Sequence, residues 1–388
     1  MTCTNQIVRF ALSDPSGVTG FSISSKVEAG AAGLLVRGST EVGGICTDYS
    51  GNLYISDAAQ HCIIKVDEGG RVSNFAGTPG TSGNDAAWSR VANNSAHFDT
   101  PKGICCDKSG NIYVADSGNH KIRVISGGYV NSVAGASTGV SGKVDGSGAT
   151  ARFYSPTGIC VDATGTLYVA DTDNNCVRKI SPRGDVLTIA GNIATGAAGD
   201  AENVEANGQT AMFTMPLDVA VDAEGNVYVL DTGNHKIKKI VPRGWVYLHS
   251  GSGTAGTSLG TGTTKMYTCQ YNELSYCDMD RSGHLYVVDW SENATRLLSL
   301  DYNGNPSEIA DFAGTSEVQC PVAVAVTPGQ KVMVTLSGYQ EGMHSSSSST
   351  SESSESSSSS TSESSSSSST SESSSSSSTS ESSSSSSS

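Results

Sequence analysis

The sequence predicts an all-β protein built from one repeated unit, and three observations predict it. First, four stretches are nearly identical and a fifth is looser, namely residues 51–57, 110–116, 165–171, 225–231 and 283–289. Second, the aspartates that end them are 59, 55, 60 and 58 residues apart. Third, short alternating apolar runs bounded by Gly, Pro and Asp surround each stretch, which is typical of strands joined by turns. A unit of this size cannot bury its apolar face alone, so neighbouring units must stack.

The unit that begins at residue 156 contains four predicted strands. They cover residues 156–161, 166–170, 176–180 and 186–191. The turn between the first two, residues 162–165, begins with Asp and ends with Gly, which supplies a permissive backbone. Four short antiparallel strands per repeat are the blade of a β-propeller.

The two ends of the chain are expected to share the last blade. A sixth unit begins at residue 321 and stops two strands short, whereas residues 6–11 and 20–24 offer two strand-like runs before the first full repeat. We expect these ends to complete one blade, because a closed ring leaves no sheet edge open. The predicted fold is therefore a six-bladed β-propeller over residues 1–344.

The repeat resembles a known family. The pattern Pro-x-Gly-Ile-x-Val-Asp-x-x-Gly-Asn-Ile-Tyr-Val-Ala-Asp-x-Gly-Asn-His-Lys-Ile-Arg is similar to the NHL repeat. Residues 101–123, 156–180 and 216–240 match it closely, and residues 42–66 and 274–298 match more loosely. The resemblance implies a six-bladed β-propeller. It leaves function open, because NHL-like propellers include protein- and RNA-binding platforms, adhesion modules and a few enzymes.

Charge and hydropathy exclude several kinds of partner. Before Ser345, 23 Lys and Arg stand against 33 acids, a net charge of about −10. This balance argues against a nucleic-acid partner, including the RNA of an RNA-binding NHL platform, and gives no polybasic segment for anionic membranes. No run of 18 apolar residues is present, so we expect no membrane insertion. The first residues lack a basic region followed by an apolar core, which predicts cytoplasmic synthesis without a secretory signal.

Residues 345–388 contain only Ser, Thr and Glu. Because they cannot bury apolar surface, we expect a disordered linker or spacer. The alternative is a stalk modified by O-glycosylation or phosphorylation. The tail repeat ends out of phase, which suggests a piece of a longer protein. A propeller followed by such a spacer suggests a binding head displayed on a virion or a cell surface.

Five of the ten cysteines recur at equivalent positions of the repeat, namely Cys46, Cys105 and Cys160 in one register and Cys62 and Cys176 in another. Equivalent positions on separate blades are too far apart for a disulfide, which needs Cα atoms within about 7 Å. We therefore expect reduced thiols that act as small buried apolar groups.

The long links between blades carry the first candidate site. Each is about 20 residues long, rich in small polar residues, and expected to lie on one face of the ring. An aromatic residue three positions before the opening proline of a blade is expected to fill the gap between blades. Because loops on a rigid scaffold commonly carry binding, the remaining large side chains are the candidates. They are Trp88, Tyr154 and Met215.

Two carboxylates depart from the repeat on the predicted innermost strands and form the second candidate site. Asp218 stands where other repeats have glycine, and Asp278 stands where they have cysteine. A buried carboxylate is costly unless it is paired or bound to a cation. Asp218 and Asp278 are therefore candidates for calcium binding or catalysis in a central channel. The zinc-holding histidines of NHL-like amidating lyases have no matching set here, and the repeated aspartates and His120 are expected to be structural.

These observations favour a non-enzymatic propeller, without a cofactor, that recognises a protein or glycan through its long loops. The alternative is a metal-dependent propeller lyase or hydrolase that uses the channel near Asp218 and Asp278.

Overall fold

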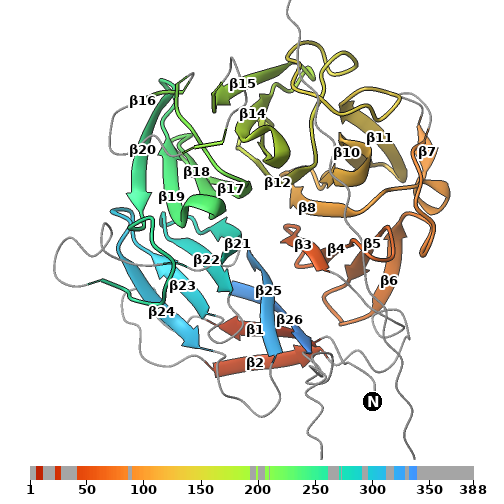
Figure 1. Cartoon of the computed structure of the whole chain (residues 1–388). Helices are drawn as coiled ribbons and strands as arrows, with labels where there is room; N and C mark the ends of the chain where they lie inside the picture. The colour runs from red at the N-terminus through yellow and green to blue at the C-terminus, as the bar shows by residue number, and fades with distance from the viewer. Residues whose placement is uncertain are drawn as a thin grey trace, which may run out of the picture. The chain divides into compact units, whose positions relative to one another are not determined.

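The computed structural model describes residues 6–11, 22–27, 42–85, 90–192, 198–199, 206–208, 210–260, 271, 273–290, 296–311, 319–327 and 332–338. Within these residues the strands form six antiparallel sheets, five of which are blades built from consecutive strands around a central axis (Figure 1). The predicted all-β propeller is confirmed. Residues Met1–Glu341 group as one unit by their contacts. Residues 345–388, the predicted tail, lie outside the described residues. No helix in the described part of the chain is long and apolar enough to cross a membrane.

Each blade runs from an innermost strand to an outer one. The innermost strands are β3 (Val42–Thr47), β8 (Pro101–Cys106), β12 (Pro156–Val161), β17 (Pro216–Val221), β21 (Glu273–Met279) and β25 (Gln319–Val326). The second strands are β4 (Leu53–Asp57), β9 (Ile112–Asp116), β13 (Leu167–Asp171), β18 (Val227–Asp231), β22 (Leu285–Trp290) and β26 (Val332–Gly338). The third strands of the first five blades are β5 (Cys62–Val66), β10 (Lys121–Ser126), β14 (Cys176–Ile180), β19 (Lys236–Ile240) and β23 (Arg296–Leu300). Their fourth strands are β6 (Val72–Ala76), β11 (Tyr129–Ala134), β15 (Val186–Ala190), β20 (Trp245–Ser250) and β24 (Pro306–Asp311).

One sheet contains both ends of the described chain, in the order β2-β1-β26-β25. β1 (Gln6–Ala11) pairs with β26 from Gln6↔Leu336 to Phe10↔Val332, and β2 (Ser22–Val27) pairs with β1. Five blades are therefore complete within consecutive strands, whereas the sixth sheet exists only through this pairing. β25 lies against β21 on one side and β3 on the other.

The apolar core lies between blades. Phe98, Phe153 and Phe213, the aromatic residues that precede the innermost strands, are completely buried. Phe98, for example, packs among residues of β5 from one blade and β9 from the next. This confirms the prediction that these aromatic side chains fill the gaps between blades. Burial at every gap makes each blade depend on its neighbours.

The expectation that the long links lie on one face of the ring needs correction. Each link that precedes blades 2, 3 and 4 (the blades that begin with β8, β12 and β17) runs to the outer strand of the same blade before the innermost strand starts. β7 (Val91–Ala92) pairs with β11, and β16 (Ala206–Asn207) pairs with β20. In blade 3, Gly146 forms a bridge with Val186 of β15. The links thus cover outer strands whose backbone groups would otherwise be open to pairing.

Glycine on the innermost strands is required by close backbone approach. A Cβ on Gly103 would overlap the carbonyl oxygen of Thr157 on the next blade and would lie 3.0 Å from the Cα of Gly158. We therefore expect Gly103→Ala to lower the free energy of unfolding by about 3 kcal/mol, because two backbones would have to separate. Gly69→Ala is the matched control, since its Cβ would meet only a carboxylate oxygen of Asp67, at 3.3 Å. Equal effects in urea denaturation would contradict the requirement.

Candidate functional site

The aspartates that end the second strands hold the links in place. Arg178 of β14 is completely buried, and its Nη1 lies 2.7 Å from Asp171 Oδ2. Its Nη2 lies 2.8 Å from Asp145 Oδ1 and donates to the carbonyl of Val144, so one guanidinium joins the blade to its link. Asp171 Oδ1 also accepts the N–H of Tyr154 at 2.8 Å. The carboxylate of Asp171 is therefore a structural acceptor, in agreement with the predicted structural role.

Arg123 with Asp116 and Lys238 with Asp231 repeat this arrangement in blades 2 and 4. This ion pair has a signal in the sequence that was not among the repeat features described above. A basic residue stands seven positions after the terminal aspartate in four of the five repeats, namely Arg123, Arg178, Lys238 and Arg296.

A second recurring contact joins one blade to the next. The 3-10 turns η2 (Ser117–Asn119), η3 (Thr172–Asn174) and η4 (Thr232–Asn234) each end in a left-handed residue. In blade 2 that residue is His120, whose Nδ1 accepts the N–H of Ser155 at 3.0 Å. In blade 3 it is Asn175, whose Oδ1 accepts the N–H of Met215 at 3.0 Å. These boundary hydrogen bonds explain the expected structural role of His120.

The residues that donate this hydrogen bond carry backbone strain. Thr100, Ser155 and Met215 have φ of +48°, +47° and +49°, although none is glycine. Such conformations persist only where the surroundings hold them. His61 accepts the N–H of Thr100 at 3.0 Å, as His120 does for Ser155. The backbone ahead of the innermost strands is thus fixed on three successive blades.

Two predicted site residues are exposed on this fixed backbone. Tyr154 is 44% exposed and Met215 is 53% exposed. Turn η3 joins them, because Asp173 donates its N–H to the carbonyl of Tyr154 at 3.2 Å while Asn175 holds Met215. Tyr154 also packs edge-on with His120, at 5.5 Å between ring centroids. We call Tyr154, Asp173 and Met215 the blade 3–4 patch. Trp88, the third loop candidate, lies outside the described residues.

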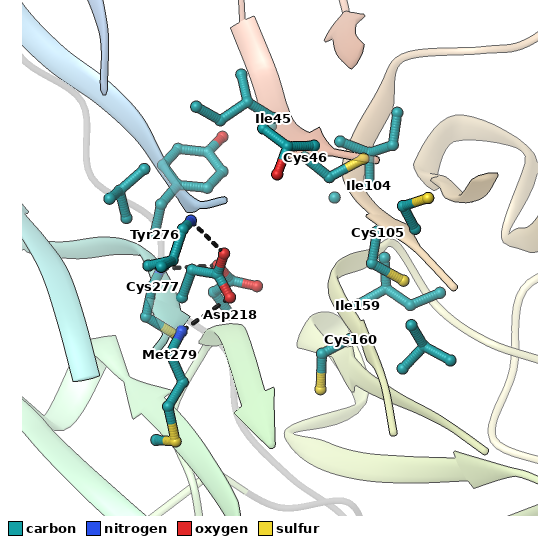
Figure 2. A pocket seen from close by; sticks show the side chains of 18 of the residues that line it. Ile45, Cys46, Ile104, Cys105, Ile159, Cys160, Asp218, Tyr276, Cys277 and Met279 are labelled. Carbon is teal, nitrogen blue, oxygen red and sulfur yellow. Dashed lines mark hydrogen bonds between the residues drawn. The ribbon is translucent and has the colours of Figure 1, made fainter. Parts of the chain in front are cut away.

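The second candidate site is a cavity of about 240 Å³ among the innermost strands (Figure 2). Its lining begins at the third or fourth residue of β3, β8, β12, β17 and β21 and at the sixth residue of β25. It continues into the turns that follow, where Tyr49, Arg281 and Thr327 contribute. The residues that precede the innermost strands do not line it. The cavity and the blade 3–4 patch therefore belong to opposite ends of the innermost strands.

Asp218 and Asp278 both line this cavity, as the channel prediction requires. Asp218 Oδ2 accepts the N–H of Cys277 on the next blade at 2.9 Å, and Asp278 Oδ2 accepts the N–H of Val326 at 2.6 Å. Each carboxylate therefore joins neighbouring innermost strands. Burial raises the pKa of Asp218 to about 7 and that of Asp278 to about 6, although these backbone hydrogen bonds act in the opposite direction.

Thiols make up much of the opposite wall of the cavity, where Cys46, Cys105 and Cys160 occupy equivalent positions (Figure 2). All three are free, as are Cys62, Cys106, Cys176 and Cys277. Burial raises the pKa of each thiol well above its usual value, so the reactive thiolate form is disfavoured. The three side chains are free thiols, as the sequence predicted, and they contribute small apolar groups to the packing around the cavity.

The donor set of the cavity does not fit a metal ion. Within the described ranges, no group of three or more His, Cys, Asp or Glu side chains is arranged to hold one. The backbone N–H groups already use acceptor positions of both carboxylates. The calcium expectation therefore gains no support from this geometry.

The blades, their buried aromatic plugs and the central cavity define a β-propeller. A family model described as NHL repeat matches residues 98–125, 153–180 and 213–240. The chain contains NHL repeats, and the resemblance seen in the sequence is confirmed.

Curated relatives share this region over part of their length. Protein SUPPRESSOR OF QUENCHING 1, chloroplastic, from Arabidopsis thaliana is 27% identical over 66% of this chain, which covers 24% of that protein. NHL repeat-containing protein 2 from Gallus gallus is 33% identical over 52% of this chain, which covers 30% of it. Teneurin-4 from Homo sapiens is 25% identical over 76% of this chain, which covers 11% of it. The chain thus spans less than a third of each relative.

Solved structures of similar shape include enzymes. A gluconolactonase from Xanthomonas campestris, XC5397, is 12% identical with a TM-score of 0.49, covering 77% of this chain and 86% of that chain. A virginiamycin B lyase from Staphylococcus aureus is 11% identical with a TM-score of 0.46, covering 77% of this chain and 78% of that chain. At these values neither likeness carries an argument about activity.

Proposed function

We propose that this chain is a non-enzymatic protein-binding propeller and that the blade 3–4 patch is its contact surface. The observation that supports the proposal is that large side chains are exposed on a backbone that hydrogen bonds hold in place. Tyr154 and Met215 expose large side chains, yet their backbone N–H groups are held by Asp171 and Asn175. A preorganised contact surface loses less entropy on binding, and exposed aromatic residues are frequent binding hot spots.

The chemistry of the patch favours a protein partner over a glycan. The patch presents three exposed side chains, the thioether of Met215, the phenol of Tyr154 and the carboxylate of Asp173. Methionine adapts to apolar side chains of different shapes. We therefore propose a partner segment that places a basic side chain on Asp173 between apolar groups. A glycan ligand would instead call for several polar groups around an aromatic platform.

Panning a displayed random-peptide library on the full chain tests the proposal. Selected peptides should lose at least tenfold in affinity, measured by calorimetry, for Tyr154→Ala and for Met215→Ala, because each change removes an exposed contact from a fixed backbone. Tyr302→Ala is the matched control, since Tyr302 is 74% exposed in a turn of blade 5. Loss of binding in the control, or none in the patch variants, would refute the assignment. A glycan array with the same variants tests the other ligand class.

The alternative, a lyase or hydrolase in the channel, rests on the cavity and its two buried carboxyl groups. Because the donor set does not fit a metal ion, we propose that the carboxyl groups act in the assembly of the innermost strands. Calcium titration followed by thermal unfolding tests this choice directly. A stoichiometric calcium ion that raises the unfolding temperature would favour the alternative.

We also propose that the mixed sheet of β1, β2, β25 and β26 closes a six-bladed ring, since β25 touches the innermost strands on both sides. A closed ring would fix the blade 3–4 patch more firmly than an open one. Display of this head on a virion or cell surface remains a prediction.

A further inference from the structure

We propose that His120 is an acid-sensitive support of the blade 3–4 patch, so that partner binding through Tyr154 weakens when the imidazole takes up a proton. The inference rests on the proposed function for its binding part. Its structural part concerns only the boundary hydrogen bond between His120 and Ser155.

The geometry requires one protonation state. His120 Nδ1 receives the N–H of Ser155 at 3.0 Å, so this nitrogen must keep its lone pair and any ring proton must sit on Nε2. A protonated imidazole has a donor at both nitrogens and would direct an N–H at the N–H of Ser155. Protonation therefore replaces an attraction with a repulsion at a residue whose φ of +47° already costs free energy.

Tyr154 lies next to this bond. Its ring packs edge-on with the His120 ring, and its chain neighbour Ser155 is the residue that His120 holds. On its other side, Tyr154 keeps the contacts with Asp171 and Asp173. Loss of the boundary hydrogen bond thus removes one of two supports, which loosens the patch without unfolding the blade.

Blade 3 supplies a natural comparison. Asn175 occupies the position of His120 and holds Met215 with the same 3.0 Å bond, but an amide does not titrate. The two halves of the patch are therefore held by one titrating and one non-titrating acceptor. The amides of Ser155 and Met215 can therefore be compared within one molecule, one with a titrating acceptor and one with a non-titrating acceptor.

The charged groups that face His120 set the pH range. Burial lowers the pKa of His120 below its usual 6.5. The carboxylate of Asp173 in η3, a hydrogen bond with the backbone of Ser117 and the carboxylate of Asp99 ahead of β8 oppose this shift. The ring is therefore neutral in the folded protein at pH 7. The unfolded chain binds the proton first as the pH falls, so the contribution to stability is complete above pH 6.5 and is lost below it.

Amide hydrogen exchange on the full chain between pH 7.5 and 5 tests the support. After correction for the intrinsic pH dependence, protection of the Ser155 amide should fall about tenfold or more, whereas protection of the Met215 amide should stay constant. In His120→Asn, which copies Asn175, Ser155 should remain protected at pH 5. Equal behaviour of the Ser155 and Met215 amides in the wild-type chain would overturn the proposal without any variant.

Affinity for a panned peptide provides the second readout. The wild-type chain should lose about tenfold between pH 7.5 and 5.5, and His120→Asn should not. If the Ser155 amide responds to pH but no peptide depends on Tyr154, the proposed function fails while the acid-sensitive bond stands. If peptides depend on Tyr154 but the Ser155 amide does not respond, the acid-sensitive support is refuted and the function stands.

Discussion

Arg178→Ala is expected to lower the free energy of unfolding by about 4 kcal/mol, as found when one partner of a buried ion pair is removed. Both charged side chains are completely buried, and the change leaves the Asp171 carboxylate without its cation. It also frees the link that Arg178 holds through Asp145 and through the carbonyl of Arg152. Urea denaturation monitored by fluorescence measures the change.

Arg183→Ala is the matched control, because Arg183 lies five positions further on in an exposed turn. Exposed substitutions of this kind change stability by less than about 0.5 kcal/mol. Arg178→Lys should recover part of the loss, since blade 4 uses Lys238 with Asp231 at 2.7 Å. Similar effects for Arg178→Ala and Arg183→Ala would refute the structural role of the ion pair.

Asp218 is expected to make stability fall as the pH rises through neutrality. Its folded-state pKa of about 7 lies above the ordinary 3.8 of a carboxyl group, because burial disfavours the charge. The folded protein therefore keeps a proton that the unfolded chain releases. The favourable contribution is complete below pH 4 and is lost as the pH rises through 7. A difference of about three pKa units corresponds to about 4 kcal/mol at most.

Comparison with Asp218→Asn isolates this contribution. Asparagine keeps the shape and one acceptor oxygen but does not titrate. Measured by urea denaturation from pH 4.5 to 8, the stability of the wild-type chain relative to the variant should decline steadily by several kcal/mol. A difference between the two chains that is independent of pH would show that Asp218 is already ionised in the folded state.

Much of the architecture follows from the residues alone. The terminal aspartates, the opening prolines and the buried Phe153 and its equivalents are local signals that recur, so their agreement across repeats predicted the blades. The recurring Cys105 and its equivalents were correctly predicted to be free thiols.

The course of the links was not predictable. Nothing in the composition of residues 135–155 indicates that Gly146 bridges to Val186 on the outer strand, because that pairing is non-local. The same limit applies to Asp218, whose partner is the N–H of Cys277, 59 residues away on the next blade. Backbone partners leave no mark in a sequence, since every residue except proline carries the same N–H.

The sequence by itself determined the repeated four-stranded unit, the family to which the repeat is similar and the residues that depart from it. Strand period, turn chemistry and apolar pattern are local properties, so they can be read along the chain. Only the tertiary structure decided that Tyr154 and Met215 are both hydrogen-bonded to η3 or its C-cap, and that Asp218 and Asp278 lie at the other end of the innermost strands. Those relations arise where separate blades pack together, and their geometry is set by contacts between residues far apart in the chain.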